Sequence, residues 1–191
     1  MSKFILTLEY DEICECPSEW SEWDVFSFNK RHCNFKDPRE FFSGVTSSYD
    51  PIPKTLGLRR KLEVGTAFTL SCYDHSLITW GLRGEVFQCR WDTAQLAGLL
   101  LWKSKPSLMP KGYKERAQMA RDFLVDYNSW CNGECYSFIL EDDQGNMIDS
   151  CGGFLGSDYF AEEIESLIKD KDVEVVGNAA HLSRCYHLSG A

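Results

Sequence analysis

The sequence contains no hydrophobic run long enough to cross a membrane. Its longest apolar run, Leu96–Trp102, falls far short of the roughly 20 residues that a transmembrane helix needs. The N-terminal apolar stretch Phe4–Leu8 is short, acidic residues follow it, and no small-residue cleavage site is present, so it is not typical of a secretory signal. We therefore expect a cytoplasmic protein, located in the cytosol of its host cell and making no contact with a membrane.

The familiar signatures of catalysis and cofactor binding are also missing. The sequence has no phosphate-binding loop, no dinucleotide-binding glycine motif, no nucleophile elbow and no zinc-protease motif. Cys72, Asp74 and His75 are close in sequence, but neighbouring side chains on a strand point to opposite faces. Asp74-His75-Ser76 is better interpreted as a polar turn. We expect no cofactor, and the sequence favours a non-catalytic protein.

Cysteine is abundant, yet its pattern predicts neither disulfides nor a metal centre. The nine cysteines are odd in number and accompany no secretion signal, which argues against a disulfide scaffold. Thiolate and imidazole ligands suit zinc, and the weak candidates for such a site are Cys14, Cys16, His32 and Cys33. Their spacing is not that of paired Cys-x-x-Cys sites. We expect reduced, partly buried thiols and no metal, with a zinc-dependent enzyme as an alternative.

The sequence has an excess of negative charge. Its 191 residues are 43% hydrophobic and 26% charged, with 29 acidic against 20 basic residues and a net charge of −9. This composition is typical of a globular protein with a core and argues against direct nucleic-acid binding, because phosphate contacts need a basic surface. Acidic residues gather in Glu9–Asp24 and again between 122 and 174, whereas Lys54–Lys61 and Lys103–Arg121 are basic.

Hydrophobic periodicity predicts an α+β fold. Alternating or continuous apolar residues indicate strands at Lys3–Glu9, Ala67–Cys72, Leu77–Trp80, Gln95–Trp102, a hairpin within 136–154, and Val173–Val176. Helical spacing indicates helices at 112–132 and 159–169. We expect a single domain over residues 1–191, an antiparallel β-sheet packed by two helices. Its N-terminal third should be loop-rich, with a short strand at Val25–Phe28, and its weakly patterned tail, 177–191, should be mobile.

Three segments, in this order, resemble one known family. They are Lys36–Phe41, then Tyr73–Ser76 with Phe87–Gly98, and finally Tyr127–Gly156. The family comprises small, mostly uncharacterised proteins carried by phages, prophages and plasmids. Its members show an Asp-Asn-Pro-Arg-Glu box, a Tyr-Asp-His-Ser box and an Asp-Ser-Cys-Trp-Gly-Phe box. This chain is similar to a divergent member, with Gly152 where a Trp is usual.

The resemblance implies an origin on a mobile element and brings no catalytic residues with it. The boxes themselves favour structural roles, with Trp91 and Phe87 expected to anchor the core. Asp92 and Gln95 can satisfy backbone groups beside a buried strand. A binding site built from these boxes is the alternative interpretation.

The combined hypothesis is a phage or mobile-element protein that binds and inhibits a host defence nuclease, of the anti-CRISPR or anti-restriction type. Surface carboxylates can stand in for phosphates and occupy a Lys- and Arg-lined channel. Trp20 and Trp23 lie among acidic residues, where they either anchor an interface or pack inward. The expected partner-binding residues are Glu9, Asp11, Glu12, Glu15, Glu19, Trp20, Glu22, Trp23, Asp24, Asp142, Asp143, Glu162 and Glu163.

Two other functions stay open at this point. One is the metal-dependent enzyme built on Cys and His. The other is a non-catalytic accessory or regulatory protein of the mobile element, which would have a self partner, as a homo-oligomer, or a partner encoded by the element. The sequence alone does not name the partner and does not say whether the acidic segments share one surface.

Overall fold

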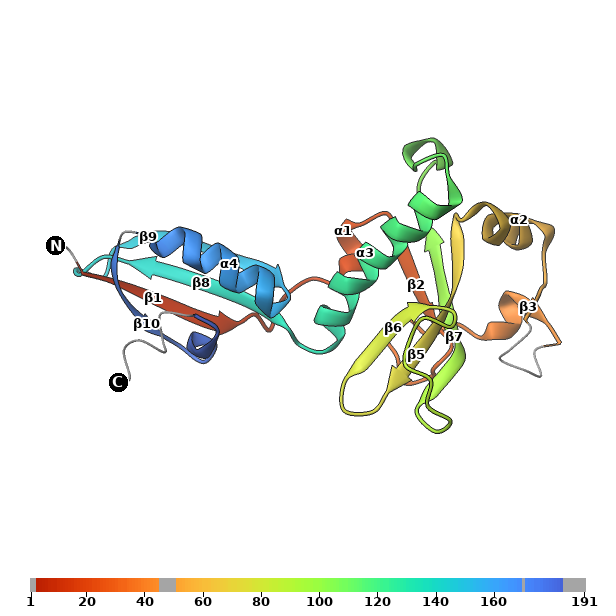
Figure 1. Cartoon of the computed structure of the whole chain (residues 1–191), viewed down its shortest axis with the longest axis horizontal. Helices are drawn as coiled ribbons and strands as arrows, with labels where there is room; N and C mark the ends of the chain where they lie inside the picture. The colour runs from red at the N-terminus through yellow and green to blue at the C-terminus, as the bar shows by residue number, and fades with distance from the viewer. Residues whose placement is uncertain (1–2, 45–50, 170, 184–191) are drawn as a thin grey trace. The chain divides into compact units, whose positions relative to one another are not determined.

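The computed structural model describes residues 3–44, 51–169 and 171–183. The chain forms two compact units, each described here by itself (Figure 1). The terminal unit combines Met1–Cys16 with Ser129–Ala191, and the central unit is Pro17–Asn128.

The terminal unit is built on a four-stranded sheet with the strand order β10-β1-β8-β9. Its strands are β1 (Lys3–Tyr10), β8 (Cys135–Glu141), β9 (Met147–Leu155) and β10 (Asp172–Val176). β1 pairs antiparallel with β8, so that Leu6 lies opposite Leu140, and parallel with β10. The two ends of the chain are thus joined through β1 and β10, a pairing that no local sequence signal predicts.

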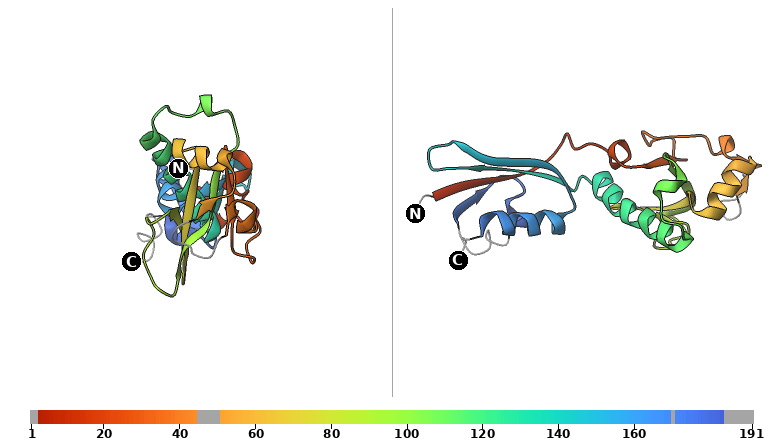
Figure 2. Two further views of the ribbon diagram at one scale, coloured as in Figure 1. Left: turned by 90° about the vertical axis from the view of Figure 1, so that its right-hand side faces the viewer. Right: turned by 90° about the horizontal axis from the view of Figure 1, so that it is seen from above.

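One helix, α4 (Ser157–Ile168), covers one face of this sheet (Figure 2). Its buried residues Phe160, Ile164 and Ile168 recur at helical spacing and pack with the inward-facing side chains of β1 and β8. The Tyr136 and Phe160 rings stack with centroids 5.1 Å apart. Gly156 occupies the N-cap position of this helix, and no side chain caps it.

The beginning of the tail is packed, contrary to the expectation of mobility from residue 177. Gly177 has a φ of 102°, and a Cβ there would lie 2.1 Å from the Leu8 carbonyl oxygen. The Ala179 N–H donates to the same carbonyl at 3.0 Å. A short 3-10 helix, η3 (Ala180–Leu182), follows, and Ala179 and Ala180 are buried. Residues 184–191 lie outside the described part of the chain.

The central unit contains an antiparallel sheet with the order β2-β7-β5-β6. Its strands are β2 (Trp23–Ser27), β5 (Ala67–Asp74), β6 (Ile78–Leu82) and β7 (Thr93–Trp102). β7 lies in the middle and is buried along most of its length, as its continuous apolar sequence predicted. Gly98 permits the close approach of β2, because a Cβ there would lie 2.3 Å from the Phe26 carbonyl oxygen.

Three helices belong wholly or mainly to the central unit: α1 (Pro17–Trp20), α2 (Leu56–Val64) and α3 (Tyr113–Cys131), whose last residues are counted with the terminal unit. α3 packs Tyr113 against Phe68 and Tyr127 against Trp80. α2 packs around Phe42 of the short strand β3 (Phe42–Ser43). β3 pairs with β4 (Ile52–Pro53), and the 3-10 helices η1 (Pro38–Glu40) and η2 (Pro106–Leu108) complete the unit.

The N-terminal third is less loop-rich than the sequence suggested, because α2 lies within it. The Thr55 side chain accepts a hydrogen bond from the Leu58 N–H at the start of α2, and Gly65, with a φ of 75°, ends the helix. Both are ordinary helix-boundary signals. The neighbouring prolines Pro51 and Pro53 and the run of basic residues concealed them, since few apolar positions mark the inward face.

The α+β class is confirmed: helices pack on largely antiparallel sheets. The strands that were expected to form one sheet are divided between two sheets with separate cores. Among the described residues, no helix is both long enough and apolar enough to cross a membrane.

Candidate functional site

Charge is segregated between the two units. By sequence, the terminal unit carries 16 Asp and Glu residues against four Lys and Arg residues. The central unit carries 13 acidic and 16 basic residues. The excess of negative charge therefore belongs entirely to the terminal unit, with a net charge of −12 against +3 for the central unit.

This division separates the expected partner-binding residues. Those in the terminal unit are Glu9, Asp11, Glu12, Glu15, Asp142, Asp143, Glu162 and Glu163. Those in the central unit are Glu19, Trp20, Glu22, Trp23 and Asp24. Within the terminal unit the set is spread further. Glu9 lies near the end of β1, Asp142 and Asp143 lie in the turn beyond β8, and Glu162 and Glu163 lie on α4.

Several of these carboxylates already serve the fold. Asp142 closes the β8–β9 turn by accepting from the Gln144 and Asn146 N–H groups at 2.9 Å, and hydrogen bonds from Asn146 lower its pKa. Asp11 accepts from the Gly153 N–H at 2.9 Å. Glu22 accepts from the Ser104 hydroxyl. These groups are less available to a partner than their sequence position suggested.

The two tryptophans among the acidic residues differ in solvent exposure. Trp23 is 2% exposed and packs edge-on against Trp102, with ring centroids 5.0 Å apart. It is a core residue, so the inward-packing alternative is correct for it. Trp20 stays largely exposed at the end of α1.

The terminal unit has a second sheet face, opposite α4. Leu6, Leu8, Phe138 and Leu140 point toward α4, so the alternation of a strand places their neighbours on the other face. That open face carries Ile5, Thr7 and Glu9 of β1, Ser137, Ile139 and Glu141 of β8, and Glu174 and Val176 of β10, paired in register. Ile139 is 40% and Val176 36% exposed, so aliphatic and acidic side chains share this surface.

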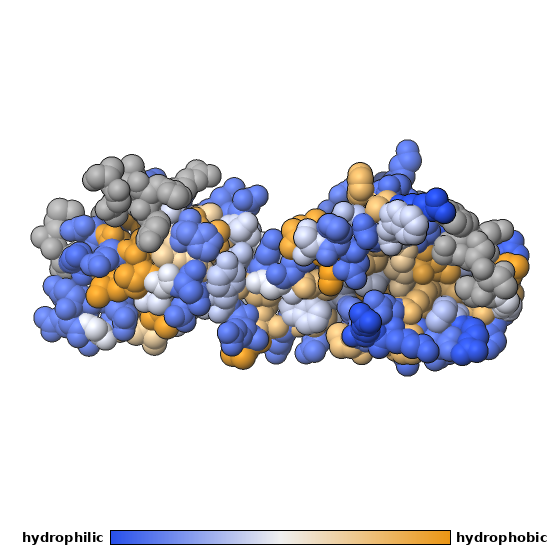
Figure 3. Space-filling model, turned by 90° about the horizontal axis from the view of Figure 1, so that it is seen from below, coloured by the Kyte–Doolittle hydropathy of each residue, from blue (hydrophilic) through white to orange (hydrophobic). Residues whose placement is uncertain are grey.

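Figure 3 shows hydrophobic side chains exposed between hydrophilic ones in both units. In the central unit, one hollow is a pocket of about 450 Å³ at the end of the sheet. Its lining residues come from β5, β6, β7, the loop before β7 and the segment after β2. They are Phe28, Asn29, Cys72, Asp74, Trp80, Trp91, Asp92, Thr93, Ala94, Leu96 and Ala97.

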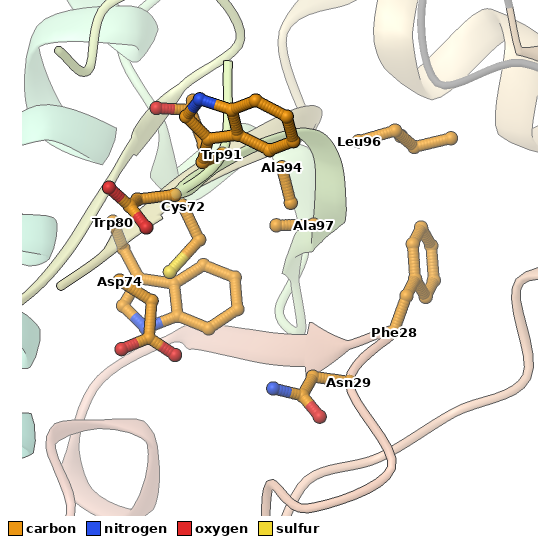
Figure 4. Close-up of a pocket in the computed structure, with 11 residues that line it drawn as sticks. Phe28, Asn29, Cys72, Asp74, Trp80, Trp91, Ala94, Leu96 and Ala97 are labelled. Atoms are coloured by element: carbon orange, nitrogen blue, oxygen red, sulfur yellow. The ribbon is translucent and has the colours of Figure 1, made fainter. Parts of the chain in front are cut away.

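Strand register brings the two carboxylates of this pocket to one end. Tyr73 pairs with Thr93, and the Asp74 N–H donates to the Asp92 carbonyl at 2.9 Å. Asp74 and Asp92 are therefore direct neighbours across the β5–β7 pair. Figure 4 shows Trp91 and Asp74 at different sides of the cavity, with Ala94 and Ala97 between Trp91 and Phe28.

The loop before β7 is a tight turn organised by Thr93. The Thr93 hydroxyl donates to the Phe87 carbonyl at 2.7 Å and accepts from the Cys89 N–H at 2.9 Å. The turn directs Trp91 and Phe87 outward, and they are 83% and 70% exposed. The expectation that these two rings anchor the core is wrong. Phe87 instead packs edge-on against Tyr73, with centroids 5.4 Å apart.

Polar contacts hold Asp92 at the mouth of the pocket. Its carboxylate accepts from the Cys89 thiol at 3.2 Å and lies 3.5 Å from His75 Nδ1. The polar turn predicted at Asp74–Ser76 is confirmed, between β5 and β6.

The pocket lacks an activated nucleophile. Burial, and then the negative charge of Asp74, raise the pKa of the Cys72 thiol to about 12. A nucleophilic cysteine needs the opposite shift, because the thiolate is the reactive form. The arrangement can bind a ligand between aromatic rings and carboxylates, but it does not favour thiol catalysis at Cys72.

The weak zinc candidates are divided between the two units. Cys14 and Cys16 belong to the terminal unit, and His32 and Cys33 to the central unit. His32 Nε2 lies 3.2 Å from the Tyr127 hydroxyl, and its Nδ1 accepts from the Asn34 N–H at 3.3 Å. The part of the chain that the structure describes holds no group of three or more His, Cys, Asp or Glu residues arranged for a metal ion.

The pocket residues Asp74, Trp91 and Asp92 all lie in the second resemblance segment, for which structural roles were favoured and a binding site was the alternative. The turn at Thr93 is what exposes Trp91, and no periodicity signals it. No protein-family model, curated protein or solved structure matches the chain. The resemblance to the mobile-element family therefore stays a prediction.

Proposed function

We propose that the chain is a binding protein whose acidic terminal unit docks on a basic, nucleic-acid-binding surface of a protein partner. The partner class that we propose is a defence nuclease of the host, which a phage or mobile element would inhibit in this way. The observation that carries the proposal is the segregation of charge, with 16 acidic residues against four basic ones in the terminal unit.

The open sheet face of the terminal unit is the surface that fits this role. Glu9, Glu141 and Glu174 flank the exposed aliphatic side chains of Ile139 and Val176. Interfaces combine an apolar centre with a polar rim, and carboxylates attract Lys and Arg side chains that otherwise hold phosphates. Lys3 pairs with Glu174 at 2.7 Å, but both side chains are more than half exposed, so a partner's cation can replace Lys3 at little cost.

The inhibitory mechanism is competition. A partner that holds duplex DNA in a basic channel cannot hold the terminal unit there at the same time. Because ion pairs at such an interface are screened by salt, the association should weaken as the salt concentration rises.

A pull-down from lysate of cells that contain restriction and CRISPR nucleases tests the proposal. The expected result is a nuclease that is retained at low salt, released by a salt gradient and displaced by duplex DNA. The variant Glu9→Gln/Glu141→Gln should lose most of this retention. Retention of no nuclease, or of one that duplex DNA leaves bound, contradicts the proposal.

A matched control removes the same charge from the other face of the same unit. Glu162→Gln/Glu163→Gln changes two exposed carboxylates on α4 and should leave retention close to wild type. If the α4 variant weakens retention as much as the open-face variant does, the terminal unit acts through its net charge and the open face is not the docking surface.

A further inference from the structure

The central-unit pocket combines aromatic side chains and carboxylates in one lining. Phe28, Trp80 and Trp91 supply three rings to its lining, and Asp74 and Asp92 supply two carboxylates. None of the described lining residues is Lys or Arg. The pocket therefore presents an apolar surface with a negative end.

Asp74 is the carboxylate most available to a ligand. Its side chain has no hydrogen bond or ion pair within the described residues, whereas Asp92 already accepts from Cys89 and lies near His75. Figure 4 shows the Asp74 carboxylate beside the Trp80 ring at the edge of the cavity. The Trp80 indole nitrogen is buried and has no hydrogen-bond partner within the described residues.

The Trp91 ring is already occupied on one side by a cation from its own chain. The Arg90 guanidinium carbon lies 5.1 Å from the centroid of the Trp91 ring. Guanidinium groups are attracted to the negative face of an indole. Trp91 is thus an exposed indole whose environment accepts guanidinium.

We infer that this pocket binds an organic cation, with a guanidinium or ammonium head between Asp74 and Asp92 and an apolar stem against Trp91, Ala94 and Ala97. The volume of about 450 Å³ lies within the range of small-ligand sites and accommodates an arginine side chain. A phosphate or carboxylate ligand would instead meet two carboxylates, and no Lys or Arg among the lining residues would offset their charge.

The inference is independent of the function proposed for the terminal unit. The pocket belongs entirely to the central unit, and its test uses small molecules in place of the protein partner. Either proposal can fail while the other stands.

The test titrates the full chain with Nα-acetyl-arginine methylamide and, separately, with its neutral isostere Nα-acetyl-citrulline methylamide. Binding is followed by Trp fluorescence and by the indole N–H signals in NMR spectra. The expected result is saturable binding of the arginine probe that perturbs the Trp91 indole signal. The citrulline probe should bind with an affinity at least about tenfold lower, which corresponds to about 1.4 kcal/mol of binding free energy. Equal binding of the two probes, or no binding of either, overturns the inference.

Three variants locate the interaction. Asp74→Asn and Trp91→Ala each change an exposed side chain. Each should lower the affinity for the arginine probe at least about fivefold and leave the unfolding curve unchanged. Arg90→Gln should tighten binding, because it removes a competing cation from the Trp91 ring. Weaker binding of the arginine probe in Arg90→Gln would show that Arg90 does not compete with a bound cation for the Trp91 ring, and it would overturn the inference.

Matched controls lie in the same unit, away from the pocket. Glu40→Gln removes an exposed carboxylate and Trp20→Ala an exposed indole, and both should bind the probe as wild type does. If either control weakens binding as much as its pocket counterpart does, the probe is not bound in the pocket.

Two further probes distinguish the sources of the cation. A five-residue peptide with one central arginine between glycines represents a protein side chain, and agmatine represents a free metabolite. Tighter binding of the peptide assigns the pocket to a protein ligand, and tighter binding of agmatine assigns it to a small molecule. Both outcomes support an organic cation.

Discussion

The side chain of Asn128 satisfies both backbone hydrogen-bonding groups of Trp80. Asn128 Oδ1 accepts from the Trp80 N–H at 2.7 Å, and Asn128 Nδ2 donates to the Trp80 carbonyl at 2.9 Å. β6 is an edge strand, so these groups face away from β5. Asn128, near the end of α3, thus supplies the hydrogen bonds that a further strand would supply to β6. It thereby holds in place the strand that contributes Trp80 to the pocket.

Asn128→Ala should destabilise the protein by about 2–3 kcal/mol, because it leaves two partly buried backbone groups of Trp80 without partners. Urea unfolding followed by circular dichroism measures this. Gln118→Ala, on the exposed side of the same helix, should change stability by about 0.5 kcal/mol or less. Equal effects of the two substitutions would show that the Asn128 contact contributes nothing specific.

Gly98→Ala should destabilise the protein by about 2 kcal/mol or more. The new methyl group would lie 2.3 Å from the Phe26 carbonyl oxygen, in a backbone that cannot move away without disturbing the β2–β7 pairing. Gly57→Ala is the matched control in helix α2, where the nearest atom is 4.0 Å away, and it should stabilise by about 0.5–1 kcal/mol. Chemical denaturation of both variants checks the opposite signs. A neutral Gly98→Ala would contradict the tight β2–β7 approach.

Stability should fall as the pH drops below about 6.5 in a manner that depends on His32. Burial lowers the pKa of His32 from its usual 6.5, so the unfolded chain binds a proton more readily than the folded chain does. The stabilising contribution is therefore present above pH 6.5 and is lost as the pH falls through the lowered value. Urea unfolding between pH 5 and pH 8 should show a shallower pH dependence for His32→Gln. An unchanged dependence would mean that other groups cause it.

Cys72 should resist alkylation in the folded protein, because burial and the charge of Asp74 raise its pKa to about 12. At pH 8, iodoacetamide should modify the exposed Cys33 and Cys151 long before Cys72, as mass spectrometry of digested protein can measure. The same shift predicts that stability declines as the pH rises from about 9 toward 12, since the unfolded thiol then loses its proton first. Early modification of Cys72 would contradict its placement.

Local periodicity predicted most of the elements, and long-range pairing decided how they assemble. The stripe from Ala117 to Tyr127 and the alternation in Tyr136–Leu140 predicted α3 and β8 because each repeats within a few residues. The pairing of Leu6 with Leu140 and of Phe4 with Val173 spans most of the chain. No short-range signal carries it, and it is what divides the strands between two sheets.

The candidate sites were less predictable than the fold. The acidic residues were visible in the sequence, but only the pairing of β1, β8 and β10 shows which of them share a face with Ile139. Trp91 was expected to be a core anchor because large rings usually are buried. Its exposure depends on the hydrogen bonds of Thr93 to Phe87 and Cys89, which a sequence pattern does not encode.

Competition between the terminal unit and nucleic acid for a nuclease can be measured in a cleavage assay. A panel of purified restriction nucleases and CRISPR effectors would cut a duplex substrate in the presence of increasing amounts of the chain. We expect at least one nuclease to lose activity and excess duplex DNA or added salt to reduce the inhibition. The variant Glu9→Gln/Glu141→Gln should inhibit less than Glu162→Gln/Glu163→Gln. Full activity of every nuclease, or inhibition that excess DNA does not relieve, would contradict it.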